Sequence, residues 1–185
     1  MKNITFVTSN PNKAREVESI LGTDNLAMRS LEVSEIQSFS LEEIVRAKAE
    51  EAQRQMNEAV LVEDIAIDLP VLKGFPGPFV KFWEKVGGHD AAVEIAEKLG
   101  DARATVRCGV GYADGDQFLY VEGKVDGTFV AKRGDEGWGF DFYFVPQGET
   151  QTYSEMGPDA KNLISHRRKG WELMRSVLRE RGILE

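Results

Sequence analysis

Hydrophobic and polar positions along the chain follow two periods, which predict an alternation of strands and helices. Short apolar runs rich in β-branched residues predict buried strands. Segments with apolar residues at i, i+3, i+4 and i+7 predict helices with one face in a core. The predicted strands cover residues 4–7, 26–33, 60–62, 103–113, 117–131 and 142–145. The predicted helices cover 11–21, 41–56, 79–86, 90–99 and 166–178, with a helical turn at 156–162.

The helix predicted after Ser40 has the clearest start in the sequence. Ser40 and Glu43 have the spacing of a capping box, in which each side chain bonds the other residue's backbone N–H. Lys48 falls on the apolar stripe of this helix, where an ammonium group is costly unless it reaches solvent or meets a negative charge. The pattern favours a functional Lys48 over a side chain that merely extends to the surface. The stripe itself consists of Leu41, Ile44, Val45, Ala49, Ala52 and Met56.

Residues 60–81 combine an apolar strand, two acids, a turn and a lysine. Glu63 and Asp64 follow the apolar run directly, and we expect them at the end of a buried strand. The turn segment Gly-Phe-Pro-Gly-Pro at 74–78 swings the chain back and places Lys81 on the following helix. This arrangement suggests a cleft that holds a cation and an anion together. An ordinary exposed loop with acidic residues explains the same stretch equally well.

Two predicted helices carry positive charge at their N-termini, the end that favours anions. In the first, Asn10 can cap the helix and Pro11 suits the first helical position. Lys13 lies in its first turn, where a cation opposes the helix dipole by roughly 0.3–1 kcal/mol. A bound anionic ligand would explain this placement, and a solvated surface lysine is the other explanation. The last helix begins with His166, Arg167, Arg168 and Lys169.

A glycine-rich loop at residues 133–141 holds two aromatic rings, Trp138 and Phe140, followed directly by Asp141. Flat rings on a tightly turned backbone suit stacking against a nucleobase. Aromatic residues that pin the loop to the core are the other explanation, and for a loop taken alone it is the favoured one.

Composition limits the classes of protein to which the chain can belong. Its 185 residues suffice for one well-packed domain, and we expect residues 1–185 to form one. No apolar membrane span and no signal-peptide pattern are found, so we expect a cytoplasmic protein without a membrane partner. The net charge of −8 argues against binding to polymeric nucleic acid, which requires a basic surface. The single cysteine, Cys108, excludes an intrachain disulfide and a thiolate metal site.

The residues with unusual positions form one chemical set. Oxygen ligands without a cysteine or histidine cluster favour Mg²⁺ or Mn²⁺, and Mg²⁺ usually takes one or two carboxylates together with substrate phosphates. Lysines neutralise the remaining phosphate charge. The set therefore suits a nucleoside triphosphate with a divalent metal. Its members are Glu35, Glu63, Asp64, Lys13, Lys48, Lys81, Lys161, Trp138, Phe140, His166 and Arg167.

The order of these motifs resembles that of the inosine triphosphate pyrophosphatases, enzymes that hydrolyse non-standard purine nucleoside triphosphates (ITP, dITP and XTP) to the monophosphate and pyrophosphate. Each motif is weak alone, whereas the joint order over nearly the whole chain is specific. The matching pieces are Thr8-Ser9-Asn10-Pro11-Asn12-Lys13, Glu35, Lys48, Val62-Glu63-Asp64, the turn at 74–78 with Lys81, Trp138-Gly139-Phe140-Asp141, Lys161-Asn162 and Ser165-His166-Arg167.

The resemblance implies a fold, a cofactor and partners. The implied fold is α/β, a mixed central β-sheet flanked by helices, in two lobes with the active-site cleft between them. The implied cofactor is Mg²⁺, with Mn²⁺ as the alternative. The implied partners are a small-molecule purine nucleoside triphosphate and a second copy of the chain in a homodimer.

The resemblance also implies roles for individual residues. Glu35 and Asp64 would hold the metal, with Glu63 as a further candidate, and Asp64 would be the base that activates water for attack on the α-phosphorus. Phe140 would stack on the purine, and His166 and Arg167 would hydrogen-bond its keto edge. Phosphate contacts are implied for Thr8, Ser9, Asn10, Pro11, Asn12, Lys13, Lys48, Lys81 and Lys161. Further substrate contacts are implied for Ile65, Trp138, Gly139 and Asp141.

Donors at the keto edge would reject adenine, because its 6-amino group would leave a buried donor unpaired at a cost of roughly 1–3 kcal/mol. Two positions depart from the family pattern: Ile65 stands where the family often has Ser or Thr, and Phe142 where it usually has Pro. Two rival functions stay open beside this one. One is a pyrophosphatase of related fold that acts on modified pyrimidine nucleotides, and the other is a nucleotide sensor without catalysis.

Overall fold

The computed structural model describes residues 4–21, 26–115 and 117–184. Its residues form two compact units. The first unit contains Met1–Asp64, Cys108–Gly123 and Arg167–Glu185, and the second contains Ile65–Arg107 and Lys124–His166. The chain passes from one unit to the other inside β3, β5 and β6, which each contribute residues to both, and once more between the first two residues of α6.

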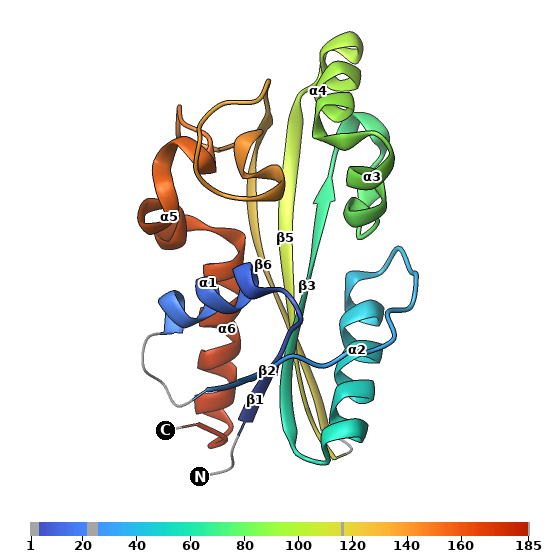
Figure 1. Ribbon diagram of the computed structural model, residues 1–185, viewed down its shortest axis with the longest axis vertical. Helices are drawn as coiled ribbons and strands as arrows, with labels where there is room; N and C mark the ends of the chain where they lie inside the picture. Colours follow the sequence, from blue (N-terminus) through green and yellow to red (C-terminus); the bar gives the residue numbers. More distant parts are fainter. Residues whose placement is uncertain (1–3, 22–25, 116, 185) are drawn as a thin grey trace. The chain divides into compact units, whose positions relative to one another are not determined.

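The strands of the described residues form one seven-stranded sheet with the order β2-β1-β3-β5-β6-β7, and β4 pairs with β3 (Figure 1). β1 is parallel to both β2 and β3, whereas β4 is antiparallel to β3 and β7 is antiparallel to β6. The mixed sheet flanked by helices is therefore confirmed. The strands are β1 (Ile4–Val7), β2 (Ala27–Arg29), β3 (Ala59–Asp68), β4 (Pro76–Gly77), β5 (Arg103–Asp114), β6 (Gln117–Phe129) and β7 (Phe144–Pro146).

The strand β3 extends past the two acids that were expected to end it. Glu63 and Asp64 lie in its interior, because Ile67 and Asp68 still pair with Gly77 and Pro76 of β4. The residues after Asp64 continue to pack as a strand, with Ile67 buried. The prediction of a strand end at these acids was therefore wrong, since the turn at 74–78 returns as a pairing strand.

The described part of the first unit includes the helices α1 (Pro11–Leu21), α2 (Leu41–Met56) and, from Arg167 onward, α6 (His166–Glu180). The predicted cap of α2 is confirmed in part. The Ser40 hydroxyl accepts a hydrogen bond from the Glu43 backbone N–H, while the Glu43 carboxylate accepts one from the Ser38 hydroxyl. Half of the capping box is thus present. The predicted helix stop at Gly22 lies outside the described residues.

Helices α2 and α6 cover opposite faces of β5 (Figure 1). A Cβ atom on Gly111 would lie 2.5 Å from a methyl group of Val45 in α2, and one on Gly170 in α6 would lie 3.0 Å from the carbonyl oxygen of Cys108. Successive strand residues face opposite sides, so Cys108 and Gly111 belong to different faces of β5. Glycine allows both helices to approach the strand closely.

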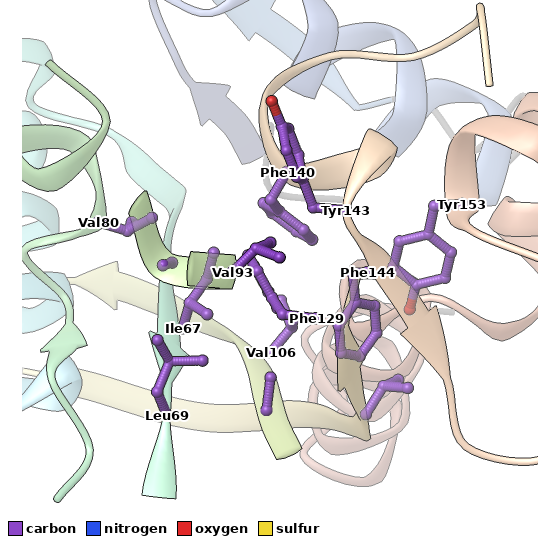
Figure 2. Packing of buried hydrophobic residues seen from close by; sticks show 13 residues of the cluster. Ile67, Leu69, Val80, Val93, Val106, Phe129, Phe140, Tyr143, Phe144 and Tyr153 are labelled. Atoms are coloured by element: carbon purple, nitrogen blue, oxygen red, sulfur yellow. The ribbon is translucent and has the colours of Figure 1, made fainter. Parts of the chain in front are cut away.

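The second unit is built around a cluster of buried apolar and aromatic side chains. Phe140, Phe144 and Tyr153 meet at its centre, with Phe140 and Phe144 in an edge-to-face arrangement 6.3 Å apart (Figure 2). The elements around this cluster are α3 (Val80–Val86), α4 (Gly88–Leu99), α5 (Tyr153–Ile164) and the 3₁₀ turns η1 (Pro70–Leu72) and η2 (Gly139–Phe142).

Helix α5 begins earlier than the helical turn that we predicted at 156–162. Thr152 and Glu155 form a reciprocal capping box at its start. Gly157, with φ of 74° and ψ of 168°, breaks the helical geometry directly before Pro158. The T-x-x-E spacing at 152–155 was the signal for the earlier start. None of the described helices combines the length and the apolar composition that a membrane crossing requires.

Candidate active site

The turn between β1 and α1 forms a capped helix start, as predicted. The Asn10 side-chain oxygen accepts hydrogen bonds from the backbone N–H groups of Asn12 and Lys13, at 2.9 and 3.3 Å. The Thr8 hydroxyl accepts one from the backbone N–H of Asn10. Ser9 and Pro11 are exposed at this turn. The cap fixes the backbone from Thr8 to Lys13 at the positive end of the helix.

Lys13 faces carboxylates of its own chain. Its ammonium nitrogen lies 3.5 Å from an oxygen of Glu63 and 3.9 Å from an oxygen of Asp64. The positive charge that opposes the dipole of α1 therefore has internal partners. This contact removes the need for a ligand as the explanation of the charge, and it places Lys13 beside the candidate metal ligand Asp64.

Lys48 joins the two acids that the sequence pattern assigned to a metal. Its ammonium nitrogen lies 2.8 Å from Glu35 Oε1 and 3.2 Å from Asp64 Oδ2. The two carboxylates therefore gather around one positive charge. Burial opposes the charge of Lys48, but the charges of Asp64 and Glu35 outweigh it and raise the pKa of the ammonium group above its usual value.

Glu63, next to Asp64 on β3, is in a different environment. Its side chain is 1% exposed, against 23% for Asp64. It accepts hydrogen bonds from Arg167 Nε at 3.0 Å and Trp171 Nε1 at 2.7 Å, and the Cys108 thiol lies 3.6 Å away. Burial favours the neutral acid, but the charges of Arg167 and Lys13 and these hydrogen bonds hold the pKa of Glu63 well below its usual range.

Arg167 is 1% exposed and directs its guanidinium group to acids of the first unit. Nε and Nη2 contact Glu63, and Nη1 pairs with Glu16 of α1. Burial opposes the charge, but Glu63 and Glu16 raise the pKa of Arg167 above its ordinary value. The family resemblance implied that Arg167 hydrogen-bonds the base, but the contacts found for its guanidinium group are with the carboxylates of Glu63 and Glu16. This pairing also explains a positive residue at the start of α6.

The donor set suits a hard divalent cation. Glu35 and Asp64 both contact the Lys48 ammonium, so they are close enough to share one positive charge. Within residues 4–21, 26–115 and 117–184, no three Asp, Glu, His or Cys side chains gather into a metal site. Two carboxylates with the remaining ligands from phosphate and water match the usual coordination of Mg²⁺.

Asp141 organises the aromatic loop of the second unit. Its carboxylate accepts hydrogen bonds from the backbone N–H of Trp138 at 3.2 Å and from the Lys161 ammonium at 2.7 Å. Both side chains of this ion pair are buried, with 2% and 5% exposed. The Lys161 nitrogen lies 5.6 Å from the centre of the Trp138 ring, within the range of a cation–π contact. The pair fixes the turn that begins at Trp138 and Gly139.

The two rings of this loop differ in accessibility. Phe140 is 4% exposed and packs in the core with Phe144 and Tyr153 (Figure 2). Its ring centre also lies 5.5 Å from that of His166. Trp138 is half-buried. Of the two rings, Trp138 is therefore the better placed to stack on a base, whereas Phe140 fits the alternative role of pinning the loop to the core. His166 is also buried, stacked 6.3 Å from the Tyr153 ring.

Two predicted residues of the second unit, Ile65 and Lys81, lie apart from this loop in the sequence, whereas Phe142 directly follows it. Lys81 is exposed in the first turn of α3. Ile65 is half-buried and packs against the apolar cluster, as does Phe142. The two departures from the expected family pattern are therefore apolar residues at the edge of the same core.

Sequence reasoning missed the partners of Glu63 and Arg167. Glu16 lies three residues after Lys13 on α1, and Trp171 lies four residues after Arg167 on α6. Residues three or four apart lie on one face of a helix, so the sequence could have indicated that Lys13 and Glu16 share a face of α1 and that Arg167 and Trp171 share a face of α6. No local signal indicated that both faces meet at β3.

The chain matches known proteins over nearly its whole length. The model of the Ham1 family matches residues 4–177. A relative in Ignicoccus hospitalis named dITP/XTP pyrophosphatase is 37% identical over 175 residues, which cover 92% of this chain and 93% of the relative. A relative in Yarrowia lipolytica named inosine triphosphate pyrophosphatase is 36% identical and covers 97% of each chain. The solved structure of the Staphylococcus aureus Ham1 protein superposes with a TM-score of 0.81 at 25% identity, covering 97% of this chain and all of that one. The chain therefore belongs to the Ham1 family.

Proposed function

We propose that the protein hydrolyses non-standard purine nucleoside triphosphates (ITP, dITP and XTP) to the monophosphate and pyrophosphate. The observation that carries this proposal is the convergence of Glu35 and Asp64 on Lys48, with Lys13 beside Asp64. Acids for a metal and lysines for phosphate belong together in a triphosphate site. The names of the family relatives support the reaction and the purine substrate.

The phosphate end of the substrate is assigned to the first unit. The capped turn from Thr8 to Lys13 offers backbone N–H groups and a positive helix end. Lys13 and Lys48 would exchange a carboxylate partner for phosphate oxygens, because both lie next to the partly exposed Asp64. Lys81 is exposed and can add a further contact. The buried Lys161 is assigned instead to the positioning of Asp141.

Glu35 and Asp64 would hold the divalent metal, for which we propose Mg²⁺. When bound, it would neutralise phosphate charge and orient the triphosphate for displacement. Glu63 is not assigned as a ligand. A carboxylate has about four acceptor sites, and those of Glu63 face Arg167, Trp171, Cys108 and Lys13.

The reaction requires a proton acceptor beside the α-phosphorus. The oxygen of a water molecule forms a bond to this phosphorus while the bond to the α,β-bridging oxygen breaks. Asp64 would accept the proton of the attacking water, and the bridging oxygen leaves with pyrophosphate. Lys13 and Lys48 would stabilise the negative charge that develops on the phosphates.

The base end is assigned to the aromatic loop and the start of α6. Trp138 would stack on the purine in place of Phe140, because Phe140 is in the core. Backbone N–H groups at the start of α6, together with His166, would bond the keto edge, because the positive end of a helix favours electron-rich groups. Adenine would place an amino donor against these donors and be rejected.

A nucleotide panel tests this proposal. Pyrophosphate release is measured with Mg²⁺ for ITP, XTP, dITP, GTP, ATP, dTTP and UTP. The proposal expects turnover of ITP and XTP well above that of ATP, and loss of turnover in Asp64→Asn with an unchanged melting temperature. A preference for pyrimidine nucleotides would support the rival pyrophosphatase. Tight ITP binding without pyrophosphate release would support the rival sensor.

Three further properties belong to the proposal. We expect residues 1–185 to unfold in one transition, because β3, β5 and β6 contribute to both units. We expect a homodimer, which sedimentation equilibrium would detect. We expect the protein in the cytoplasm, where nucleoside triphosphates are used, and cell fractionation would check this.

A further inference from the structure

Two adjacent acids of β3 have separate environments in the first unit. Successive residues of a strand point to opposite faces, and Glu63 is 1% exposed while Asp64 is 23% exposed. Asp64 contacts two lysines that lie at the edge of solvent. Glu63 contacts groups from three other elements, α1, β5 and α6. The two acids therefore have different tasks.

We propose that Glu63 is a positioning residue of the triphosphate site: held by Trp171 and Arg167 of α6, its carboxylate fixes the ammonium group of Lys13 for phosphate binding. This inference rests on the proposed function. It assigns Glu63 a task distinct from metal binding, and it gives the C-terminal helix an effect on the phosphate end of the substrate.

The contacts of Glu63 fix its carboxylate on both oxygens. Oε1 lies 3.0 Å from Arg167 Nε and 2.9 Å from Arg167 Nη2, and Oε2 lies 2.7 Å from Trp171 Nε1. Hydrogen bonds in which one partner is charged are the stronger ones in proteins. The Lys13 ammonium nitrogen also lies 3.5 Å from Oε1. The carboxylate therefore has one orientation, and Lys13 is aligned with it.

Trp171 connects this carboxylate with the strand before the phosphate turn. Its ring packs edge-to-face on Phe6 of β1 with centres 4.7 Å apart, and β1 leads directly into Thr8. The Trp171 ring is almost fully buried. The same residue thus supports both the turn backbone and the partner of Lys13.

A fixed Lys13 improves binding because a lysine side chain otherwise loses much rotamer freedom when it meets a phosphate. The Lys13 side chain is 12% exposed, so it is largely packed before substrate arrives yet remains accessible. Weakening the support of Glu63 should therefore weaken phosphate binding through Lys13, and only through Lys13.

The test is a double-mutant cycle with inorganic tripolyphosphate, which has no base. Its dissociation constant is measured by calorimetry without metal for the wild type, Trp171→Phe, Lys13→Ala and the double variant. Phenylalanine keeps a ring against Phe6 and removes the donor to Glu63. We expect Trp171→Phe to weaken binding about three- to tenfold in the wild type. In the Lys13→Ala background it should change binding by less than about twofold.

Two results would overturn the inference. In the first, Trp171→Phe weakens tripolyphosphate binding by the same factor in the wild type and in Lys13→Ala. In the second, Trp171→Phe introduced into the wild type leaves tripolyphosphate binding unchanged. Glu63→Gln, run through the same cycle, gives the same decision if Trp171→Phe does not fold. The matched control is Trp83→Phe in the second unit, whose buried Nε1 has no hydrogen-bond partner among the described residues. We expect it to leave tripolyphosphate binding unchanged.

The mutant cycle and the pyrophosphate assay together show whether the role of Glu63 or the proposed reaction is wrong. Coupling in the cycle without pyrophosphate release from ITP would contradict only the proposed reaction. Pyrophosphate release with additive effects of the two substitutions would contradict only the role of Glu63. A wild-type protein that does not bind tripolyphosphate would contradict both.

Discussion

Two lysine–carboxylate clusters, one in each unit, use the same chemical groups in different surroundings. Lys48 contacts Asp64 and Glu35, whose side chains are 23% and 41% exposed, whereas Lys161 contacts Asp141, which is 2% exposed. The first cluster can exchange partners with a substrate, because water and ligands reach its acids. The second cluster is buried, and its Asp141 carboxylate holds the loop of Trp138 in place through a hydrogen bond from the Trp138 backbone. Burial, more than residue type, therefore separates a binding lysine from a structural one.

Asp64→Asn should have the largest effect on activity. The amide keeps the size of the side chain but cannot accept the proton of the attacking water, so we expect kcat for ITP to fall by about 10²–10⁴. Steady-state pyrophosphate release measures this loss. A melting temperature close to the wild-type value is the control for folding. An active Asp64→Asn would remove Asp64 from the role of base.

Lys161→Met should mainly reduce stability. It leaves the buried Asp141 without its cation, and removal of one partner of a buried pair costs about 3–5 kcal/mol. Urea unfolding followed by fluorescence would measure the loss. The double variant Lys161→Met/Asp141→Asn should recover part of it, because no uncompensated charge remains. Equal stability of wild type and Lys161→Met would show that Lys161 is not structural. It would then favour the role that the family resemblance implied, a contact with phosphate.

Lys48→Met, in contrast to Lys161→Met, should mainly weaken substrate binding and have little effect on stability. Its acids are partly exposed and can be hydrated, so we expect the free energy of unfolding to change by no more than about 1 kcal/mol. Loss of a phosphate contact should raise KM for ITP about tenfold, as expected for a charged hydrogen bond. Kinetics and urea unfolding of the same preparation check both statements. A large stability loss with unchanged KM would reverse the comparison.

The contrast between the regions shows which parts of the site the sequence could predict. The cap at Asn10 and the inward position of Lys48 follow from local spacing, and both are found. The cation in the first turn of α1 was explained either by an anionic ligand or by a solvated surface lysine, but Glu63 and Asp64 lie beside it. Those acids are fifty residues away along the chain, so only the tertiary fold could reveal the pairing.

The assignment of the aromatic loop shows a second limit. Trp138 and Phe140 are both aromatic and two residues apart, and a pattern cannot tell which ring faces solvent. The turn η2 decides this, since Asp141 bonds the backbone of Trp138 and Phe140 enters the core. The same applies to β3, whose continuation past Asp64 depends on pairing with β4. Periodicity predicted where helices and strands lie along the chain, but not which of them pack or pair with one another.

The smallest effect should be a pH dependence of stability that arises from His89 in the second unit. Burial lowers the pKa of His89, although Glu84 and Asp90 partly oppose this. The unfolded chain then binds the proton more readily, so stability falls as pH decreases through the unfolded value of about 6.5. His89→Gln should lose less stability than the wild type between pH 7.5 and 5.5, as followed by melting temperature. Equal losses would show that His89 titrates alike in both states.

Hydrolysis of ITP in ¹⁸O-labelled water tests attack at the α-phosphorus most directly. Water that attacks the α-phosphorus, with Asp64 as the proton acceptor, places the label in inosine monophosphate and leaves pyrophosphate unlabelled. Mass spectrometry of the two products distinguishes them. Label in the pyrophosphate, or release of inorganic phosphate in its place, would contradict the proposed reaction.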